Sequence, residues 1–307
     1  MSRQITDYLK EYRKNTGLIP VSPIWGGEKL FPFLCLDHRT IAEMLGFEVV
    51  QATPFLSTVK EGQLASKTDI DSFIACGHGS FGQGDGFSDQ IIERELTYLR
   101  QMKQAESDKW IGGGCFGPLT VLSGILGIEN LLRKTVREPD QVLPMLGIVT
   151  DLMKELAYAE AEAGADFFWI AEPLASVIAP KKYESFSGRW IREIYDAAGV
   201  PGFLHVCGNT DKHTPELIKC GASVLSIDSV TDIGMCIGSV AEEATVMGNV
   251  SPVLLKSGSV DEVRAEVRSI LKAVNGHDNF ILSTGCSIID GTPDENMNVL
   301  FESAGNA

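Results

Sequence analysis

The sequence lacks the features that mark membrane-spanning and exported proteins. It has no run of about 18 apolar residues free of charge, so no ordinary transmembrane helix is expected. The segment from Met1 to Lys14 is polar and charged, and it has no apolar stretch of the kind found in signal peptides. We therefore predict a cytoplasmic protein that does not bind membranes.

Positive charge is also scarce. The 307 residues include 26 Lys and Arg against 41 Asp and Glu, which gives a formal net charge of -15. Such a field repels phosphate backbones and anionic membrane surfaces, so we expect no nucleic-acid partner. Seven cysteines in a reducing compartment indicate reduced thiols, metal ligands or core packing rather than a disulfide framework.

The chain shows no composition shift and no low-complexity tract, so we predict one domain over residues 1–307, with residues 1–17 as an N-terminal helical extension. Short apolar runs alternate with helical patterns, which predicts parallel strands buried on both faces. The candidate strands are Leu18–Ile24, Phe47–Ala52, Trp110–Cys115, Asp166–Ala171, Gly202–Val206, Ser223–Asp228, Glu243–Gly248 and Asn279–Thr284. Eight such runs favour an α/β fold, a single (β/α)8 TIM barrel.

Three further segments bear on this organisation. Phe73–Ala75 is an alternative strand near the N-terminus, and the glycine-rich stretch Gly77–Gly86 is expected to be a loop. Ser259 and Glu262 have the spacing of a capping box ahead of an amphipathic pattern, which predicts a helix start.

The strongest chemical signal is His205 and Cys207, which flank one residue at the end of a predicted strand. Residues i and i+2 of a strand point the same way, so an imidazole nitrogen and a thiolate sulfur converge on one point, as two zinc ligands must. Cys286 follows the last predicted strand. The ends of all barrel strands meet at one rim, so Cys286 can join this pair.

One histidine and two cysteines would leave a fourth zinc position open, as catalytic zinc sites do. Two thiolates balance the charge of Zn²⁺, which suits activation of a thiol toward an alkyl electrophile better than hydrolysis. The alternative is that His205 is a hydrogen-bonded core residue and the cysteines are small apolar side chains. The His-x-Cys spacing does not by itself decide between the two.

Other polar or soft side chains belong to the same predicted rim. Glu172 and Asp228 are the candidate catalytic acids, and Glu172 is also a possible displaceable fourth zinc ligand. Asn209, Asn249 and Cys115 are candidates for substrate binding because each ends or follows a predicted strand. The alternative for the acids and for Asn249 is that they cap the following helices.

Taken together, these segments resemble the uroporphyrinogen decarboxylase-like superfamily, and within it the zinc-dependent methylcobamide:coenzyme M methyltransferases. The resemblance covers most of the chain from about Trp110 onward. It is carried by Gly117–Thr120, Gly164–Asp166, Glu172–Ser176, Leu204–Asn209, Leu225–Asp228, Met247–Pro252, Leu282–Cys286 and Thr292–Asn296.

The resemblance implies a (β/α)8 barrel with zinc held by His205, Cys207 and Cys286. It also implies transfer of a methyl group from a methyl-Co(III) corrinoid, carried by a separate small protein, to a thiol activated by zinc. The acceptor is expected to be coenzyme M, another small thiol or tetrahydrofolate.

Two alternatives stay open at this point. The first is a tetrapyrrole decarboxylase of the same superfamily, although such enzymes carry an arginine after their first strand, whereas Pro20–Gly27 has none. They also need no zinc, which would leave His205, Cys207 and Cys286 unexplained. The second is a non-catalytic protein that binds a corrinoid or a thiol.

Overall fold

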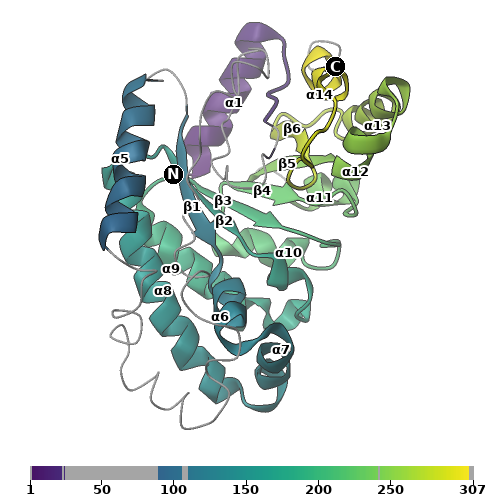
Figure 1. Ribbon diagram of the computed structural model, residues 1–307. Helices are drawn as coiled ribbons and strands as arrows, with labels where there is room; N and C mark the ends of the chain where they lie inside the picture. Colours follow the sequence, from purple (N-terminus) through teal and green to yellow (C-terminus); the bar gives the residue numbers. More distant parts are fainter. Residues whose placement is uncertain (1, 23, 25–88, 106–109, 241–242, 304–307) are drawn as a thin grey trace.

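The computed structural model describes residues 2–22, 24, 89–105, 110–240 and 243–303 (Figure 1). These residues contain a sheet of six parallel strands, which follow one another in the order of the sequence. The strands are β1 (Gly112–Phe116), β2 (Phe167–Ala171), β3 (Gly202–Val206), β4 (Val224–Ile227), β5 (Thr245–Val250) and β6 (Phe280–Thr284). The predicted parallel α/β architecture is thereby confirmed, and six predicted strands are present within two residues of their expected bounds.

The first predicted strand, Leu18–Ile24, lies beside the last strand of the sheet. Val21 forms a parallel bridge with Leu282 of β6, and two backbone hydrogen bonds of 2.9 Å flank that bridge. The first and last strands of a closed parallel barrel are neighbours in this way. The predicted strand Phe47–Ala52, the alternative Phe73–Ala75 and the predicted loop Gly77–Gly86 lie outside the described residues.

Of the described helices, the first two precede β1 and the last follows β6, and the others join consecutive strands, as expected for the crossovers of a parallel sheet. Their bounds are α1 (Ser2–Thr16), α5 (Asp89–Ala105), α6 (Pro118–Leu126), α7 (Ile128–Arg137), α8 (Pro139–Glu162), α9 (Arg189–Ala198), α10 (Thr214–Leu217), α11 (Ile233–Val240), α12 (Pro252–Ser257), α13 (Val260–Ala273) and α14 (Asp294–Ser303). The predicted capping box of Ser259 and Glu262 opens α13 with both reciprocal hydrogen bonds. No helix in the described ranges is long and apolar enough to cross a membrane.

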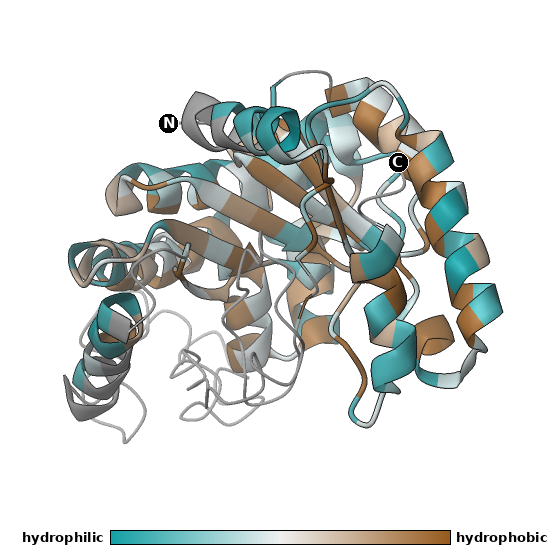
Figure 2. Cartoon of the chain, turned by 90° about the horizontal axis from the view of Figure 1, so that it is seen from above, coloured by the Kyte–Doolittle hydropathy of each residue, from teal (hydrophilic) through white to brown (hydrophobic). Residues whose placement is uncertain are grey.

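The two faces of the sheet are buried against different partners. On one face, alternate strand residues such as Ile170, Leu204 and Ile227 pack with the helices in the main hydrophobic core. On the other face, residues such as Phe167 and Met247 form a second cluster made of strand residues. Figure 2 shows the apolar strands between helices that alternate polar and apolar residues. Burial on both faces explains why the strands read as continuous apolar runs.

Glycine at Gly112 of β1 makes room for an aromatic ring on the next strand. A Cβ atom at Gly112 would lie 2.3 Å from Cε2 and 2.4 Å from Cζ of Phe167, which belongs to the second cluster. Trp169 of β2 is 4% exposed and belongs to the second cluster, on the same face as His205 of β3. The glycine-rich β1 therefore makes room for the aromatic layer beneath the candidate site.

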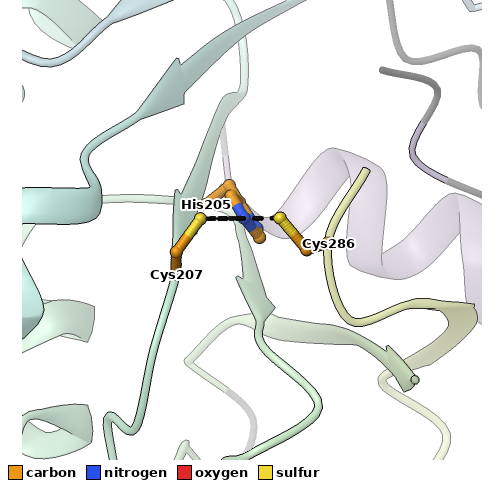
Figure 3. Close-up of side chains that lie close together, drawn as sticks. All are labelled: His205, Cys207 and Cys286. Carbon is orange, nitrogen blue, oxygen red and sulfur yellow. Dashed lines mark hydrogen bonds between the residues drawn. The ribbon is translucent and has the colours of Figure 1, made fainter. Parts of the chain in front are cut away.

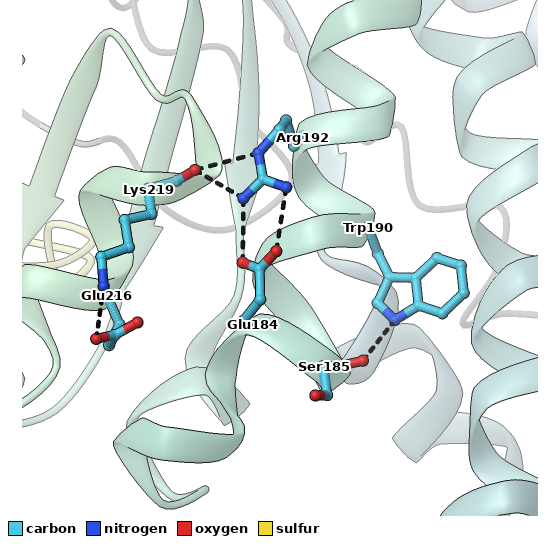
Figure 4. A network of polar contacts seen from close by, with 6 residues as sticks. All are labelled: Glu184, Ser185, Trp190, Arg192, Glu216 and Lys219. Atoms are coloured by element: carbon cyan, nitrogen blue, oxygen red, sulfur yellow. Dashed lines mark hydrogen bonds and ion pairs between the residues drawn. The ribbon is translucent and has the colours of Figure 1, made fainter.

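A polar network joins the segments that follow β2 and β3 (Figure 4). The Arg192 guanidinium of α9 donates two hydrogen bonds to the Glu184 carboxylate, in the π-helical turn η4 (Glu184–Gly188), at 3.0 and 3.1 Å. It also donates to the carbonyl oxygen of Lys219, in the 3-10 turn η5 (Ile218–Cys220). The network links consecutive strand-to-strand connections on the outside of the sheet.

Candidate metal centre

His205 and Cys207 come from the carboxyl end of β3. His205 is 4% exposed and lies within the strand, and Cys207 is half-buried directly after it. The Nε2 atom of His205 lies 3.1 Å from the Sγ atom of Cys207. The alternation of side chains along a strand puts residues i and i+2 on one face, as the sequence predicts.

Cys286 reaches the same place from the loop after β6. Its Sγ atom lies 3.6 Å from that of Cys207 (Figure 3). Two strands, β4 and β5, separate β3 from β6, and neighbouring strands lie about 4.8 Å apart. A flat sheet would hold the two strand ends about 14 Å apart, since three such spacings intervene. The contact therefore depends on curvature of the sheet toward the face that carries His205.

The three side chains offer a donor set that fits zinc. One ligand atom from each of His205, Cys207 and Cys286 lies within 4.8 Å of the others. Tetrahedral zinc with bonds of about 2.3 Å to sulfur and about 2.0 Å to nitrogen sets two sulfurs about 3.7 Å apart, and nitrogen about 3.5 Å from sulfur. The observed separations of 3.6 Å and 3.1 Å are close to these values.

The contact between the two thiols shifts their pKa values in opposite directions. The hydrogen bond from Cys207, followed by one from His205, lowers the pKa of Cys286 to about 4. The same contact with Cys286, followed by burial, raises the pKa of Cys207 above its ordinary value. Of the two thiols, Cys286 therefore loses its proton more readily, and a thiolate beside the imidazole favours a cation at this place.

The position of Cys286 depends on close contact between two loops. A Cβ atom at Gly285 would lie 2.3 Å from the backbone nitrogen of Ser229, in the loop after β4. The Gly285 N–H donates to the carbonyl oxygen of Val250 at 2.7 Å. Lys256 of α12 holds the same loop farther on, through the carbonyl oxygens of Asp290 and Gly291 at 2.7 and 2.6 Å.

Two neighbours of the His205 ring were not identified from the sequence. The Nδ1 atom of His205 lies 3.0 Å from the Oγ atom of Ser226, the residue opposite it on β4. The Trp169 ring stacks on the imidazole with centroids 5.9 Å apart and planes 19° apart. The sequence did contain a signal for Ser226, because it is the one polar residue in the otherwise apolar strand β4.

Glu172 follows β2 and is fully buried, with its carboxylate directed at the start of α6. It accepts hydrogen bonds from the backbone nitrogens of Leu119 and Thr120, at 3.0 and 2.9 Å, and from the Thr120 hydroxyl. Burial raises the pKa of Glu172 to about 7, against the opposing effect of these hydrogen bonds. Its carboxylate oxygens thus bond the N-terminus of α6, and Glu172 is not part of the cluster of His205 with the two cysteines.

Asp228 and Asn249 organise the loops around Cys207. The Asp228 carboxylate accepts from the backbone nitrogen of Gly208 at 2.8 Å, at a position where φ is +83°. Asn249 donates to the carbonyl oxygens of Asp228 and Thr231 at 3.1 and 2.8 Å. The turn after Cys207 is therefore tied to the ends of β4 and β5.

The remaining two predicted site residues lie in different surroundings. Asn209 is exposed, and its amide donates to the Asp211 carboxylate and to the carbonyl oxygen of Val230, both at 2.9 Å. Cys115 is 7% exposed in the main core, on the helix-covered face of β1, and burial raises the pKa of its thiol. The structure thus places Asn209 at the loop surface and Cys115 among the helices.

Comparison with known proteins shows the family of this chain. The sequence model of the family described as Uroporphyrinogen decarboxylase (URO-D) matches residues 90–306. The methylcobamide:CoM methyltransferase MtbA of Methanosarcina mazei is 32% identical over 200 residues, 63% of this chain and 57% of that protein. The uroporphyrinogen decarboxylase of Prochlorococcus marinus is 26% identical over 171 residues, 54% of this chain and 48% of that protein.

A solved structure is also similar. A methyltransferase from Methanosarcina mazei superposes with a TM-score of 0.63 at 27% identity, covering 71% of this chain and 64% of that one. The chain spans about half the length of the two curated relatives named above. The residues matched by the family model, 90–306, include His205, Cys207 and Cys286.

Proposed function

The chain belongs to the uroporphyrinogen decarboxylase family, and on that premise we propose that it is a zinc-dependent corrinoid methyltransferase. In this proposal, the sulfur of a small thiol loses its proton and attacks the methyl group of a methyl-Co(III) corrinoid carried by a separate protein. A carbon–sulfur bond forms, the carbon–cobalt bond breaks, and the corrinoid is left as Co(I). The observation that supports it is the convergence of one imidazole nitrogen and two sulfurs at the carboxyl ends of the strands. Relatives named methylcobamide:CoM methyltransferases support the class of donor.

We propose that His205, Cys207 and Cys286 hold the zinc. When bound, zinc supplies a position at which an acceptor thiol loses its proton while its sulfur stays nucleophilic. Two cysteine ligands suit this chemistry, because their charges offset that of the ion and keep a bound sulfur electron-rich. We propose coenzyme M or a similar small thiol as the acceptor, with tetrahydrofolate as the alternative, and the cytoplasm as the location, where thiols stay reduced.

The two predicted acids enter the proposal as positioning residues. Asp228 holds the turn after Cys207 through the Gly208 backbone nitrogen. Glu172 fixes the start of α6 beside β3, since its own backbone nitrogen donates to the His205 carbonyl oxygen at 2.8 Å. Asn249 supports the same turn through Asp228. Asn209 remains a proposed substrate contact because it is exposed on the neighbouring loop, although a substrate would have to compete with its bonds to Asp211 and Val230. Cys115 faces the helices, so we leave it out of the proposed substrate site.

We further propose that the sheet is part of a single (β/α)8-barrel domain. The bridge between Val21 and Leu282 supports this, because it puts the first predicted strand next to the last. The contact between Cys207 and Cys286 also supports it, because it requires the sheet to curve. In a barrel of this kind, residues at the carboxyl ends of the strands form the active site.

Methylcobalamin and a panel of thiols test the proposed reaction. Purified protein loaded with zinc is mixed with methylcobalamin and each thiol, and the corrinoid spectrum is followed. We expect stoichiometric zinc and loss of the methyl–cobalt band with a preferred thiol, and neither in Cys207→Ala. Zinc-free protein that decarboxylates uroporphyrinogen would contradict the proposal. Zinc and thiol binding without turnover on any acceptor, tetrahydrofolate included, would indicate a binding protein instead.

A further inference from the structure

We propose that Ser226 is a positioning residue that sets the orientation of the His205 ring, so that Nε2 faces the two sulfurs. The inference rests on the proposed function, since it concerns the proposed zinc ligand. Ser226 lies on β4 opposite His205 in the strand register and is fully buried. Its Oγ atom is 3.0 Å from Nδ1 of His205.

The two ring nitrogens of His205 have different partners. Nδ1 meets the Ser226 hydroxyl, whereas Nε2 lies 3.1 Å from the Cys207 sulfur. A zinc ligand must present an unprotonated nitrogen, so the ring proton has to sit on the other nitrogen and needs an acceptor there. Ser226 supplies that acceptor, which leaves Nε2 free to face the sulfurs.

The ring is held on its face as well as at its edge. Trp169 of β2 stacks on the imidazole with planes 19° apart, and Ser226 of β4 bonds its edge from the opposite side of β3. A half-turn of the ring would remove Nδ1 from Ser226 and Nε2 from Cys207 together. Neighbouring strands on both sides thus select one orientation of His205 before any metal arrives.

A hydroxyl suits this position because it carries no charge and can donate or accept. As metal ligands, Cys207 and Cys286 would both be thiolates and would balance a divalent ion, so a carboxylate on Nδ1 would make the centre negative. The hydroxyl can also donate to Nδ1 when Nε2 carries the proton toward a sulfur. Ser226 is therefore compatible with both the metal-free and the metal-bound tautomer.

Zinc affinity of a matched set of variants tests the inference. Ser226→Ala removes the hydroxyl, and Ser226→Thr keeps it. Ser283→Ala is the control, because Ser283 is also fully buried in the sheet but bonds the carbonyl oxygen of Ser22. Competition with a chromophoric chelator measures zinc affinity. Loss of such a partner weakens metal binding by about 10- to 100-fold, which we expect for Ser226→Ala. We expect Ser226→Thr and Ser283→Ala to stay within about threefold of wild type.

A spectroscopic measurement keeps the test decisive if Ser226→Thr does not fold. Zinc-loaded wild type labelled with ¹⁵N-histidine should show His205 protonated at Nδ1 and metal-bound at Nε2. The cobalt-substituted Ser226→Ala variant should have a spectrum different from wild type, whereas Ser283→Ala should not. A purely structural role for Ser226 would leave the spectrum unchanged.

The outcomes separate this inference from the proposed function. If Ser226→Ala binds zinc as tightly as wild type and has an unchanged cobalt spectrum, the inference about Ser226 is wrong and the proposed function is unaffected. Binding of zinc through Nδ1 also overturns the inference alone. Wild type that binds no zinc overturns both. Wild type that binds zinc but transfers no methyl group overturns only the proposed reaction, because the role of Ser226 is measured by metal affinity.

Discussion

The sulfur atoms of Cys207 and Cys286 lie 3.6 Å apart although 79 positions of sequence separate the two residues. The strands that precede them, β3 and β6, are not neighbours in the sheet. The contact between the two sulfurs therefore depends on curvature of the sheet, and the proposed metal centre can form only when that curvature is in place. The first prediction concerns this dependence on both sulfurs.

Replacing either sulfur by oxygen should abolish tight zinc binding. We expect Cys207→Ser and Cys286→Ser each to retain less than about a tenth of the wild-type zinc after dialysis, because one hard oxygen replaces a soft ligand. Cys220→Ala is the control, since Cys220 is fully buried but lies outside the cluster. Zinc content by elemental analysis and unfolding by circular dichroism check both points. Normal zinc content in Cys286→Ser would remove Cys286 from the ligand set.

A methyl group at Gly285 should disturb the centre without touching a ligand. A Cβ atom there would lie 2.3 Å from the Ser229 nitrogen, so the loop that carries Cys286 must move away from β4. We expect Gly285→Ala to weaken zinc binding at least tenfold and to lower stability by about 1–3 kcal/mol.

Gly238→Ala is the matched control for this loop variant. Gly238 lies inside α11, and a Cβ atom there meets nothing within 4 Å. Alanine in a helix interior should raise stability by about 0.5–1 kcal/mol and leave zinc affinity unchanged. Equal zinc affinities in the two glycine variants would show that the loop contact does not position Cys286.

The stability contribution of Glu172 should fall as pH rises. Burial raises its pKa from 4.5 in the unfolded chain to about 7, so the folded state binds a proton that the unfolded state has lost. This contribution is fully present below about pH 4.5 and is lost as pH rises through about 7. In Glu172→Gln it is absent. Relative to wild type, the variant should therefore gain up to about 3 kcal/mol between about pH 5 and pH 8.

Denaturant unfolding in a chelating buffer measures this difference at each pH. Glu262→Gln is the control. Glu262 is exposed, and its hydrogen bonds with Ser259 lower its pKa, so any pH dependence that it contributes has the opposite sign to that of Glu172. The stability of Glu262→Gln relative to wild type should therefore not rise over the same range. A flat difference for Glu172→Gln would mean that Glu172 is ionised throughout.

Removing the Asp228 carboxylate should loosen the turn that follows Cys207. Asp228→Ala deletes the acceptor of the Gly208 N–H, whereas Asp228→Asn keeps an oxygen that can accept it. We expect zinc affinity to fall about tenfold in Asp228→Ala and by less than threefold in Asp228→Asn. Chelator competition measures both. An equal loss in both variants would assign the effect to the charge rather than to the turn.

The strands of the sheet and the convergence of His205 with Cys207 are predictable from the local sequence pattern. Strands buried on both faces are apolar throughout, so runs such as Phe280–Thr284 stand out from the helices between them. The convergence of His205 and Cys207 follows from the period of a strand. Ser226 and Trp169 were missed as partners of His205, because both lie on other strands and their contact depends on register.

Glu172 shows the limit of that pattern. Its place after β2 predicts a side chain at the strand ends, but the same place is compatible with a metal ligand, a proton acceptor or a helix cap. The structure directs its carboxylate to the backbone nitrogens of Leu119 and Thr120. The direction of a side chain at the strand ends depends on how the neighbouring loops pack, and this packing depends on the whole sheet.

The sequence by itself determined six strands of the sheet, the start of α13 and the pairing of His205 with Cys207, because these follow from periodicity and from groups only a few residues apart. Barrel topology and the family resemblance also predicted that Cys286 joins this pair, and the structure confirms the contact. The tertiary structure alone decided that Ser226 and Trp169 contact the His205 ring and that the Glu172 carboxylate bonds the start of α6. These contacts join residues from different strands, so they exist only once register and curvature bring the strand ends together.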